Sequence, residues 1–124
     1  MPLRKKPVFL NLLQIRLPIA GIMSIIHRAS GMLMVLLIPL SVYLLDLSLA
    51  DEQGFAAVGS LLQSSLVGFT LFLLLWALLH HLYSGIRYLL IDVEIGVERP
   101  VYRYTAWAVT LLAPLSALLL WGVL

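Results

Sequence analysis

Hydrophobic residues fill three long stretches of the chain, and charged residues are confined to the segments between and before them. The stretches that contain no Asp, Glu, Lys or Arg are 29–45, 53–86 and 104–124. A membrane-spanning helix needs about 20 apolar residues, and only helices and closed barrels satisfy their backbones in lipid. The runs are continuous rather than alternating, which argues against barrel strands. We therefore predict an all-α membrane protein with three transmembrane helices, at residues 24–47, 64–91 and 103–124.

Composition supports a membrane protein. Of the 124 residues, 62% are hydrophobic and 11% are charged, whereas a soluble domain carries about 25% charged residues. The chain has no cysteine, which excludes Cys-ligated iron–sulfur clusters and thiolate zinc sites within it. A net charge of +2 is too small to indicate nucleic-acid binding, and no cleavable signal peptide is evident at the N-terminus. We expect residues 1–124 to form a single membrane-anchor domain.

Lysine and arginine are unevenly distributed around the expected spans. Before or at the start of the first span the basic residues are Arg4, Lys5, Lys6, Arg16 and Arg28. The first connection contains only acidic charges, at Asp46, Asp51 and Glu52, and the second contains Arg87, Arg99 and Arg103. Because basic loops stay on the cytoplasmic side, we expect the N-terminus and the second connection in the cytoplasm. The first connection and the C-terminus are then periplasmic, in a multi-pass protein of the bacterial inner membrane. Gly96 and Pro100 in the second connection predict a turn there.

A polar stripe follows the cytoplasmic half of the second expected span. His81, Gly85, Tyr88 and Asp92 are related by three- and four-residue steps, so they share one face of a helix. A glycine one turn from a histidine leaves room for a flat ligand, and an ionisable group in a span is a functional candidate. The alternative is a hydrogen bond from His81 to a neighbouring helix. His80 is turned by about 100° and is expected to be a helix-contact residue.

The first expected span has a similar stripe near its cytoplasmic end. Ser24, His27, Arg28 and Gly31 lie on one face by the same spacing. The hydroxyl of Ser24 and the guanidinium of Arg28, one turn apart, can donate to a carbonyl oxygen that enters from the lipid. The alternative is that Arg28 only reaches out to lipid phosphates. Because both stripes lie at the same depth on consecutive helices, we predict one shared site.

Two motifs carry a family resemblance. "SIIHRASG" is followed about fifty residues later by "HLYSGIRYLLID". Together they resemble the larger cytochrome b membrane-anchor subunits of succinate dehydrogenase (succinate:quinone oxidoreductase, respiratory complex II). The resemblance covers most of the chain, including the basic N-terminal lead, both motifs and the three spans, although the third span is generic in sequence.

The resemblance implies roles for individual residues. Ser24 and Arg28 match the serine and arginine that contact the ubiquinone head group. His81 matches an axial ligand of the iron of haem b, whose second ligand comes from a smaller membrane-anchor subunit. His27 matches a histidine close to the quinone pocket and the haem propionates.

Two further positions of the second motif complete this comparison. Asp92 matches an acidic residue associated with proton supply near the cytoplasmic end of the helix. Tyr88 stands where some relatives have histidine, and a phenol donates a hydrogen bond but is not cationic near neutral pH. Neutralisation of a propionate by Tyr88 is therefore not expected, and Arg87 lies on a different face of the helix.

The resemblance also implies partners and a reaction. Reduction of a quinone takes two electrons and two protons, and this chain has no flavin motif and no ligands for a cluster. The electrons would come from an iron–sulfur subunit that a flavoprotein supplies by oxidising succinate, in electron transport and the tricarboxylic acid cycle. The chain is then an enzyme subunit without a complete active site of its own. Two alternatives stay open: the anchor of a menaquinol:fumarate reductase, and a non-redox membrane interaction protein.

Overall fold

The computed structural model describes residues 16–123, and this part of the chain is helical. Its elements are α1 (Ile19–Ala50), α2 (Glu52–Leu62), α3 (Ser65–Asp92) and α4 (Val101–Trp121). Of these helices, α1, α3 and α4 are long and apolar enough to cross a membrane, which confirms the three predicted membrane-length helices. The basic residues Arg4, Lys5 and Lys6, on which part of the expected orientation rests, lie outside the described residues.

The helix boundaries differ from the expected spans mainly at α1. This helix has 32 residues and runs from Ile19 to Ala50, beyond the expected 24–47 at both ends. At about 1.5 Å per residue it is longer than the hydrocarbon core, which is about 30 Å thick. α3 lies within one residue of the expected 64–91, and α4 begins before and ends before the expected 103–124.

The short helix α2 occupies a segment for which the sequence predicts only a connection. Asp51 caps this helix, because its Oδ1 accepts a hydrogen bond of 2.7 Å from the backbone N–H of Gly54. Glu52 adds a negative charge to the first turn, which is favourable at a helix N-terminus. The Asp-Glu pair is a helix-start signal, but two glycines lower the helix propensity of the segment. Because residues 53–86 contain no charge, the sequence does not indicate where α2 ends and α3 begins.

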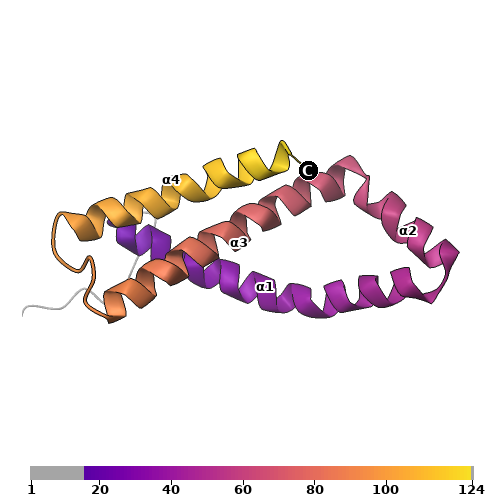
Figure 1. Ribbon diagram of the computed structural model, residues 1–124, viewed down its shortest axis with the longest axis horizontal. Coiled ribbons are helices and arrows are strands. Elements are labelled where there is room, and N and C mark those ends of the chain that lie inside the picture. Colours follow the sequence, from indigo (N-terminus) through magenta and orange to yellow (C-terminus); the bar gives the residue numbers. More distant parts are fainter. Residues whose placement is uncertain (1–15, 124) are drawn as a thin grey trace, which may run out of the picture.

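Each of the three long helices contacts the other two, and Met23 of α1 packs against Ala106 and Val109 of α4. α3 and α4 run antiparallel and lie side by side, whereas α1 crosses α3 near the α3–α4 connection (Figure 1). From this crossing α1 and α3 diverge toward the opposite end of the molecule, where α2 connects them (Figure 1). The start of α1 and the α3–α4 connection therefore lie at one end, and the acidic α1–α2 turn lies at the other.

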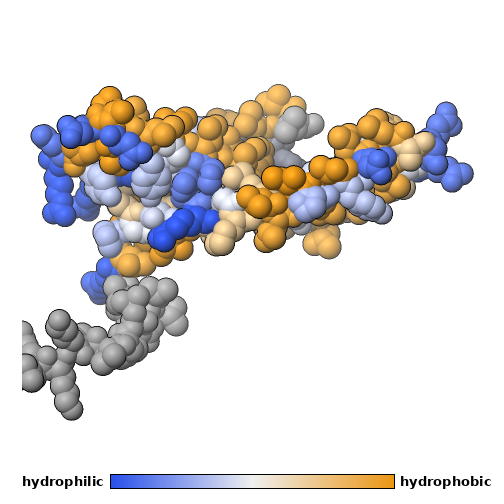
Figure 2. Space-filling model, turned by 90° about the horizontal axis from the view of Figure 1, so that it is seen from below, coloured by the Kyte–Doolittle hydropathy of each residue, from blue (hydrophilic) through white to orange (hydrophobic). Residues whose placement is uncertain are grey.

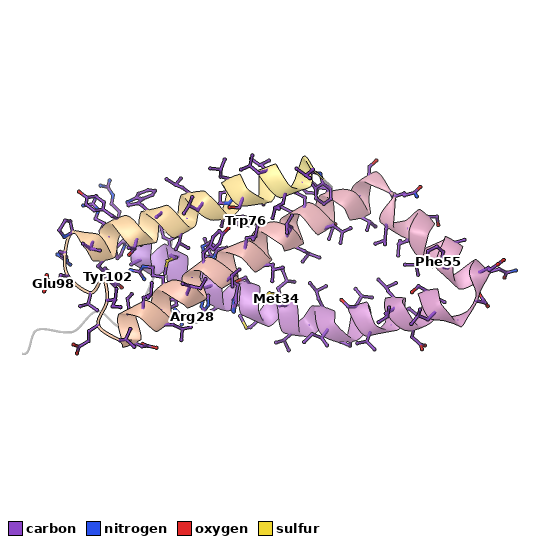
Figure 3. The ribbon with its side chains drawn as sticks, in the orientation of Figure 1. Arg28, Met34, Phe55, Trp76, Glu98 and Tyr102 are labelled. Atoms are coloured by element: carbon purple, nitrogen blue, oxygen red, sulfur yellow. The ribbon has the colours of Figure 1, made fainter. Side chains whose placement is uncertain are left out.

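Small residues let α4 pack closely on α3. Ala106, Ala113 and Ala117 on α4 have no exposed surface, and small residues are typical of helix interfaces in membranes. Trp76 projects from α3 toward α4 and packs against the cluster that contains Ala113 and Ala117 (Figure 3). Tyr83 of α3 adds a hydrogen bond of 2.9 Å from its hydroxyl to Ser116 Oγ.

Arg87 ties the C-terminal end of α3 to the start of α4. Its Nε donates to Thr105 Oγ1 at 3.0 Å, and its Nη2 donates to the carbonyl oxygen of Tyr102 at 2.8 Å. The guanidinium carbon also lies 4.4 Å from the centroid of the Tyr102 ring, a distance typical of cation–π contacts. Arg87 therefore faces α4 and serves the helix pair, and it lies off the His81 stripe, as the sequence predicts.

The turn between α3 and α4 has the backbone geometry that the sequence indicates. Gly96 has a φ of 78° and Glu94 a φ of 63°, both in the left-handed region that favours glycine. The reversal brings the start of α4 back beside the end of α3, which places Tyr102 within reach of Arg87. The turn predicted from Gly96 is confirmed.

Apolar side chains cover most of the surface between the two ends of the molecule. Leu36, Leu49 and Leu66 are 72%, 76% and 77% exposed, and soluble proteins rarely expose large continuous apolar surfaces. Hydrophilic residues gather toward the two ends of the face that Figure 2 shows. The exterior is therefore suited to lipid and to other membrane helices.

Two glycines of α2 make a matched pair for testing how closely this helix packs against the end of α1. A Cβ added to Gly54 would collide with the carbonyl oxygen of Leu47, whereas one added to Gly59 would meet open space. We expect Gly54→Ala to lower the free energy of unfolding by about 1–3 kcal/mol through overpacking. Gly59→Ala should leave it unchanged or raise it by up to about 1 kcal/mol through helix propensity. Unfolding in mixed detergent micelles measures both, and equal effects would contradict this packing.

Candidate functional site

The predicted stripes of α1 and α3 meet where the two helices cross. The imidazole rings of His27 and His81 are stacked, with centroids 4.1 Å apart and planes 14° from parallel. The His27 ring also contacts Tyr88, about two helical turns beyond His81 on α3, with centroids 5.2 Å apart and planes at 59°. His27, His81 and Tyr88 therefore form one aromatic group that joins α1 to α3.

Two glycines make this crossing close. An added Cβ at Gly31 of α1 would lie 2.9 Å from His81 Cε1, and one at Gly85 of α3 would lie 3.8 Å from His27 Nε2. A side chain at Gly31 would therefore displace the His81 ring, whereas one at Gly85 would be in ordinary contact with His27. We call these four residues the glycine–histidine interlock. Gly85 has His27 as its neighbour across the crossing, and its role as clearance for a flat ligand stays a prediction.

The backbone of α1 fixes the proton of His81. Its Nδ1 lies 3.0 Å from the carbonyl oxygen of His27 and 3.2 Å from Ser30 Oγ. A carbonyl oxygen only accepts, so we assign the proton to Nδ1, which donates to it. In a neutral imidazole the other nitrogen, Nε2, then keeps a free lone pair. A nitrogen prepared in this way is a good metal ligand.

A hollow beside His81 has the chemistry that a haem requires. It has a volume of about 560 Å³ and is lined by His27, Arg28, Gly31, Met32, Val35, Leu36 and His81. Volumes of 300–1,000 Å³ are typical of cofactor sites. Its walls are largely apolar, and Arg28 supplies a cation suited to a carboxylate. A ligating imidazole, apolar walls and one cation fit the haem that the resemblance implies.

Ser24 and Arg28 lie together, one helical turn apart on α1. Arg28 Nη2 donates to Ser24 Oγ and Arg28 Nε donates to the Ser24 carbonyl, both at the long distance of 3.4 Å. Arg28 projects from α1 close to its crossing with α3 (Figure 3) and lines the hollow beside His81. Ser24 lines a second hollow, of about 870 Å³, with Tyr88 and Arg103. Ser24 and Arg28 therefore lie between the two hollows, with one residue lining each.

The two adjacent histidines of α3 have different environments. His80 has no exposed surface, its Nδ1 lies 3.4 Å from Ser84 Oγ, and its ring lies edge-on to Trp76 with centroids 6.4 Å apart. This burial agrees with the expectation that His80 is a helix-contact residue. Asp92, the last residue of α3, is exposed, and it takes no part in the contacts of the crossing described above.

Ser30 belongs to the site although the sequence analysis did not select it. It is 4% exposed, and its hydroxyl donates to the His27 carbonyl at 2.8 Å while contacting His81. A signal was present, because Ser30 stands beside Gly31 and three residues after His27 in the first motif. The helical spacing alone does not tell which residue of α3 it meets.

The chain is similar in sequence to known membrane subunits of one family. The family described as succinate dehydrogenase/fumarate reductase transmembrane subunit matches residues 2–120. The chain is 35% identical over 106 residues to the succinate dehydrogenase cytochrome b556 subunit of Coxiella burnetii, covering 85% of each chain.

Two further relatives have the same name. The cytochrome b556 subunit of Paracoccus denitrificans is 33% identical over 93 residues, or 75% of this chain and 72% of that protein. The subunit of Rickettsia typhi is 29% identical over 118 residues, which cover 94% of this chain and 91% of that protein. With three membrane-length helices and bacterial relatives, this is a multi-pass protein of the inner membrane. The chain belongs to the succinate dehydrogenase/fumarate reductase transmembrane subunit family.

Proposed function

We propose that this chain is the larger membrane anchor of a succinate:ubiquinone oxidoreductase. In this proposal residues 1–124 form one anchor domain that holds the catalytic subunits at the membrane. His81 binds the iron of haem b, and Ser24 and Arg28 contribute to the site where ubiquinone is reduced. The relatives named succinate dehydrogenase cytochrome b556 subunit support this choice within the family.

The observation that carries the proposal is the hydrogen bond from His81 to α1. His81 Nδ1 donates to the His27 carbonyl at 3.0 Å, so Nε2 is the nitrogen available to iron. Carbonyl acceptors of this kind fix the tautomer and orientation of metal-ligating histidines. When bound, the haem supplies one-electron redox chemistry.

One axial position is not filled by this chain in our proposal. His80 is fully buried and faces away from the hollow that contains His81, so it is a poor second ligand. Among residues 16–123 no group of three or more His, Cys, Asp or Glu side chains gathers as a metal site. The resemblance implies that the second haem ligand comes from the smaller anchor subunit, which would share the haem.

Ser24 and Arg28 act on the quinone in our proposal. Arg28 is exposed, and its bonds to Ser24 are long, so both groups can turn toward an incoming carbonyl oxygen. Reduction places negative charge on that oxygen before protons arrive, and aligned donors stabilise such charge. His27 and Tyr88 border the same region, and Asp92 at the end of α3 would supply protons from the cytoplasm.

The distribution of charges supports a cytoplasmic N-terminus and a periplasmic C-terminus. The start of α1 and the Arg-containing α3–α4 connection lie at the same end of the molecule (Figure 1). Asp46, Asp51 and Glu52 flank the α1–α2 turn at the opposite end. By the positive-inside rule the quinone site is near the cytoplasmic surface, where soluble catalytic subunits would dock.

The electrons must reach this site from other chains. An iron–sulfur subunit on the cytoplasmic face would deliver two electrons to the quinone, and a flavoprotein subunit would obtain them from succinate. Two protons taken up from the cytoplasmic side complete the quinol. This chain thereby forms one wall of the quinone site and holds the complex in the bilayer.

Two other functions are distinguishable by experiment. A menaquinol:fumarate reductase would use the same architecture in the reverse direction, since the family description includes both enzymes, and quinone preference separates them. A non-redox interaction protein would give a purified complex without haem absorbance or quinone-dependent activity. The prepared Nε2 of His81 favours the redox anchor.

The assignment of the haem ligand is tested by the two adjacent histidines. We expect His81→Ala to abolish the normal low-spin b-type spectrum, because the residue that presents Nε2 to the hollow is lost. His80→Ala should largely preserve that spectrum, since its ring is buried elsewhere. Reduced-minus-oxidised spectra of the two purified complexes give the answer. Loss of the signal in the His80 variant alone would show that the helix-face assignment is wrong.

The quinone role of Arg28 is tested by Arg28→Lys. Lysine keeps the charge but lacks the planar fork of donors, so succinate:ubiquinone activity should fall by about one to two decades. This range corresponds to losing a charge-assisted hydrogen bond of about 1.5–3 kcal/mol. Succinate oxidation with an artificial acceptor that bypasses quinone should survive. Normal quinone kinetics at normal assembly would instead mean that Arg28 only anchors the helix at lipid phosphates.

A further inference from the structure

Ser30 stands at the point where α1 holds the His81 ring. Its Oγ lies 2.8 Å from the carbonyl oxygen of His27 and 3.2 Å from His81 Nδ1. The residue is 4% exposed, so lipid and water have little access to its hydroxyl. Ser30 therefore has two polar neighbours inside the crossing, and both belong to the arrangement that orients His81.

The directions of these hydrogen bonds follow from the number of protons. A hydroxyl has one proton, and the shorter contact assigns it to the His27 carbonyl, which only accepts. Toward His81 the Ser30 oxygen can then only accept. The proton on Nδ1 consequently has two acceptors, the His27 carbonyl at 3.0 Å and Ser30 Oγ at 3.2 Å.

We propose that Ser30 is a positioning residue that sets the ring plane and the donor strength of His81 toward haem iron. The proposal rests on the proposed function, in which His81 Nε2 binds that iron. A hydrogen bond accepted from the far ring nitrogen raises the basicity of a ligating imidazole. A more basic ligand favours ferric over ferrous iron, so Ser30 holds the haem potential lower than His27 alone would.

Ser48 provides a matched control on the same helix. Its hydroxyl donates to the carbonyl three residues earlier, Leu45, at 2.8 Å, which reproduces the local bond of Ser30 to His27. Ser48 lies 18 positions further along α1, about 27 Å away at 1.5 Å per residue. Ser48→Ala removes the local bond without touching the histidines, whereas Ser30→Ala removes the same bond together with the contact to His81.

The test uses the complete purified complex with Ser30→Ala, Ser30→Thr or Ser48→Ala. Two quantities are measured: the midpoint potential of the haem and the g values of its low-spin ferric electron paramagnetic resonance signal, which depend on the ring planes of the axial ligands. We expect Ser30→Ala to raise the potential and move the g values. Ser30→Thr, which keeps the hydroxyl, and Ser48→Ala should both match the unmodified complex.

Each other outcome has a defined meaning. An unchanged or lowered potential in Ser30→Ala overturns the proposal, as does an equal shift in Ser48→Ala. If Ser30→Ala fails to retain haem, restoration by Ser30→Thr supports the proposal, and failure of both variants overturns it. His81→Ala, measured in parallel, separates the hypothesis that His81 binds the iron from the hypothesis that Ser30 positions His81. If it keeps the normal low-spin signal, the proposed ligand itself is wrong, whereas a signal that depends on His81 but not on Ser30 removes only the positioning role.

Discussion

The stacking of His27 on His81 determines how α1 and α3 meet, and the rest of the site depends on that contact. Two imidazoles with centroids 4.1 Å apart lie between the helices, and the His81 ring fits because Gly31 presents no side chain to it. The His27 carbonyl then accepts a hydrogen bond from His81 Nδ1. One residue of α1 thereby fixes both the position of the neighbouring ring and the nitrogen that it leaves free.

A second constraint holds α4 in place without using the site. Arg87 satisfies the Tyr102 carbonyl and Thr105 at the start of α4, and buried alanines let the two helices approach closely. Polar groups in a membrane interior are costly unless they are hydrogen-bonded. By donating to the Tyr102 carbonyl and to Thr105, Arg87 therefore stabilises the start of α4. α3 thus uses different faces for two tasks, with Arg87 toward α4 and His81 toward α1.

Hydrophobicity and helical spacing predicted the three long helices and the two stripes that meet at the crossing. They could not predict the pairing across the crossing, because spacing defines a face of one helix but not the residue that stands opposite. The spacing accordingly does not indicate that His27 stands opposite Gly85 or that Ser30 meets His81. The helix α2 was missed because its glycines and its uncharged neighbours obscured the cap at Asp51.

The interlock is tested most directly by adding one methyl group to α1. In Gly31→Ala the new Cβ would lie 2.9 Å from His81 Cε1, whereas in Gly21→Ala on the same helix its nearest neighbour would be at 3.7 Å. The reduced-minus-oxidised spectrum of the assembled complex should lose or shift its low-spin haem signal in Gly31→Ala and remain normal in Gly21→Ala. An unchanged spectrum in Gly31→Ala at normal assembly would contradict the claim that this crossing presents His81 to the haem.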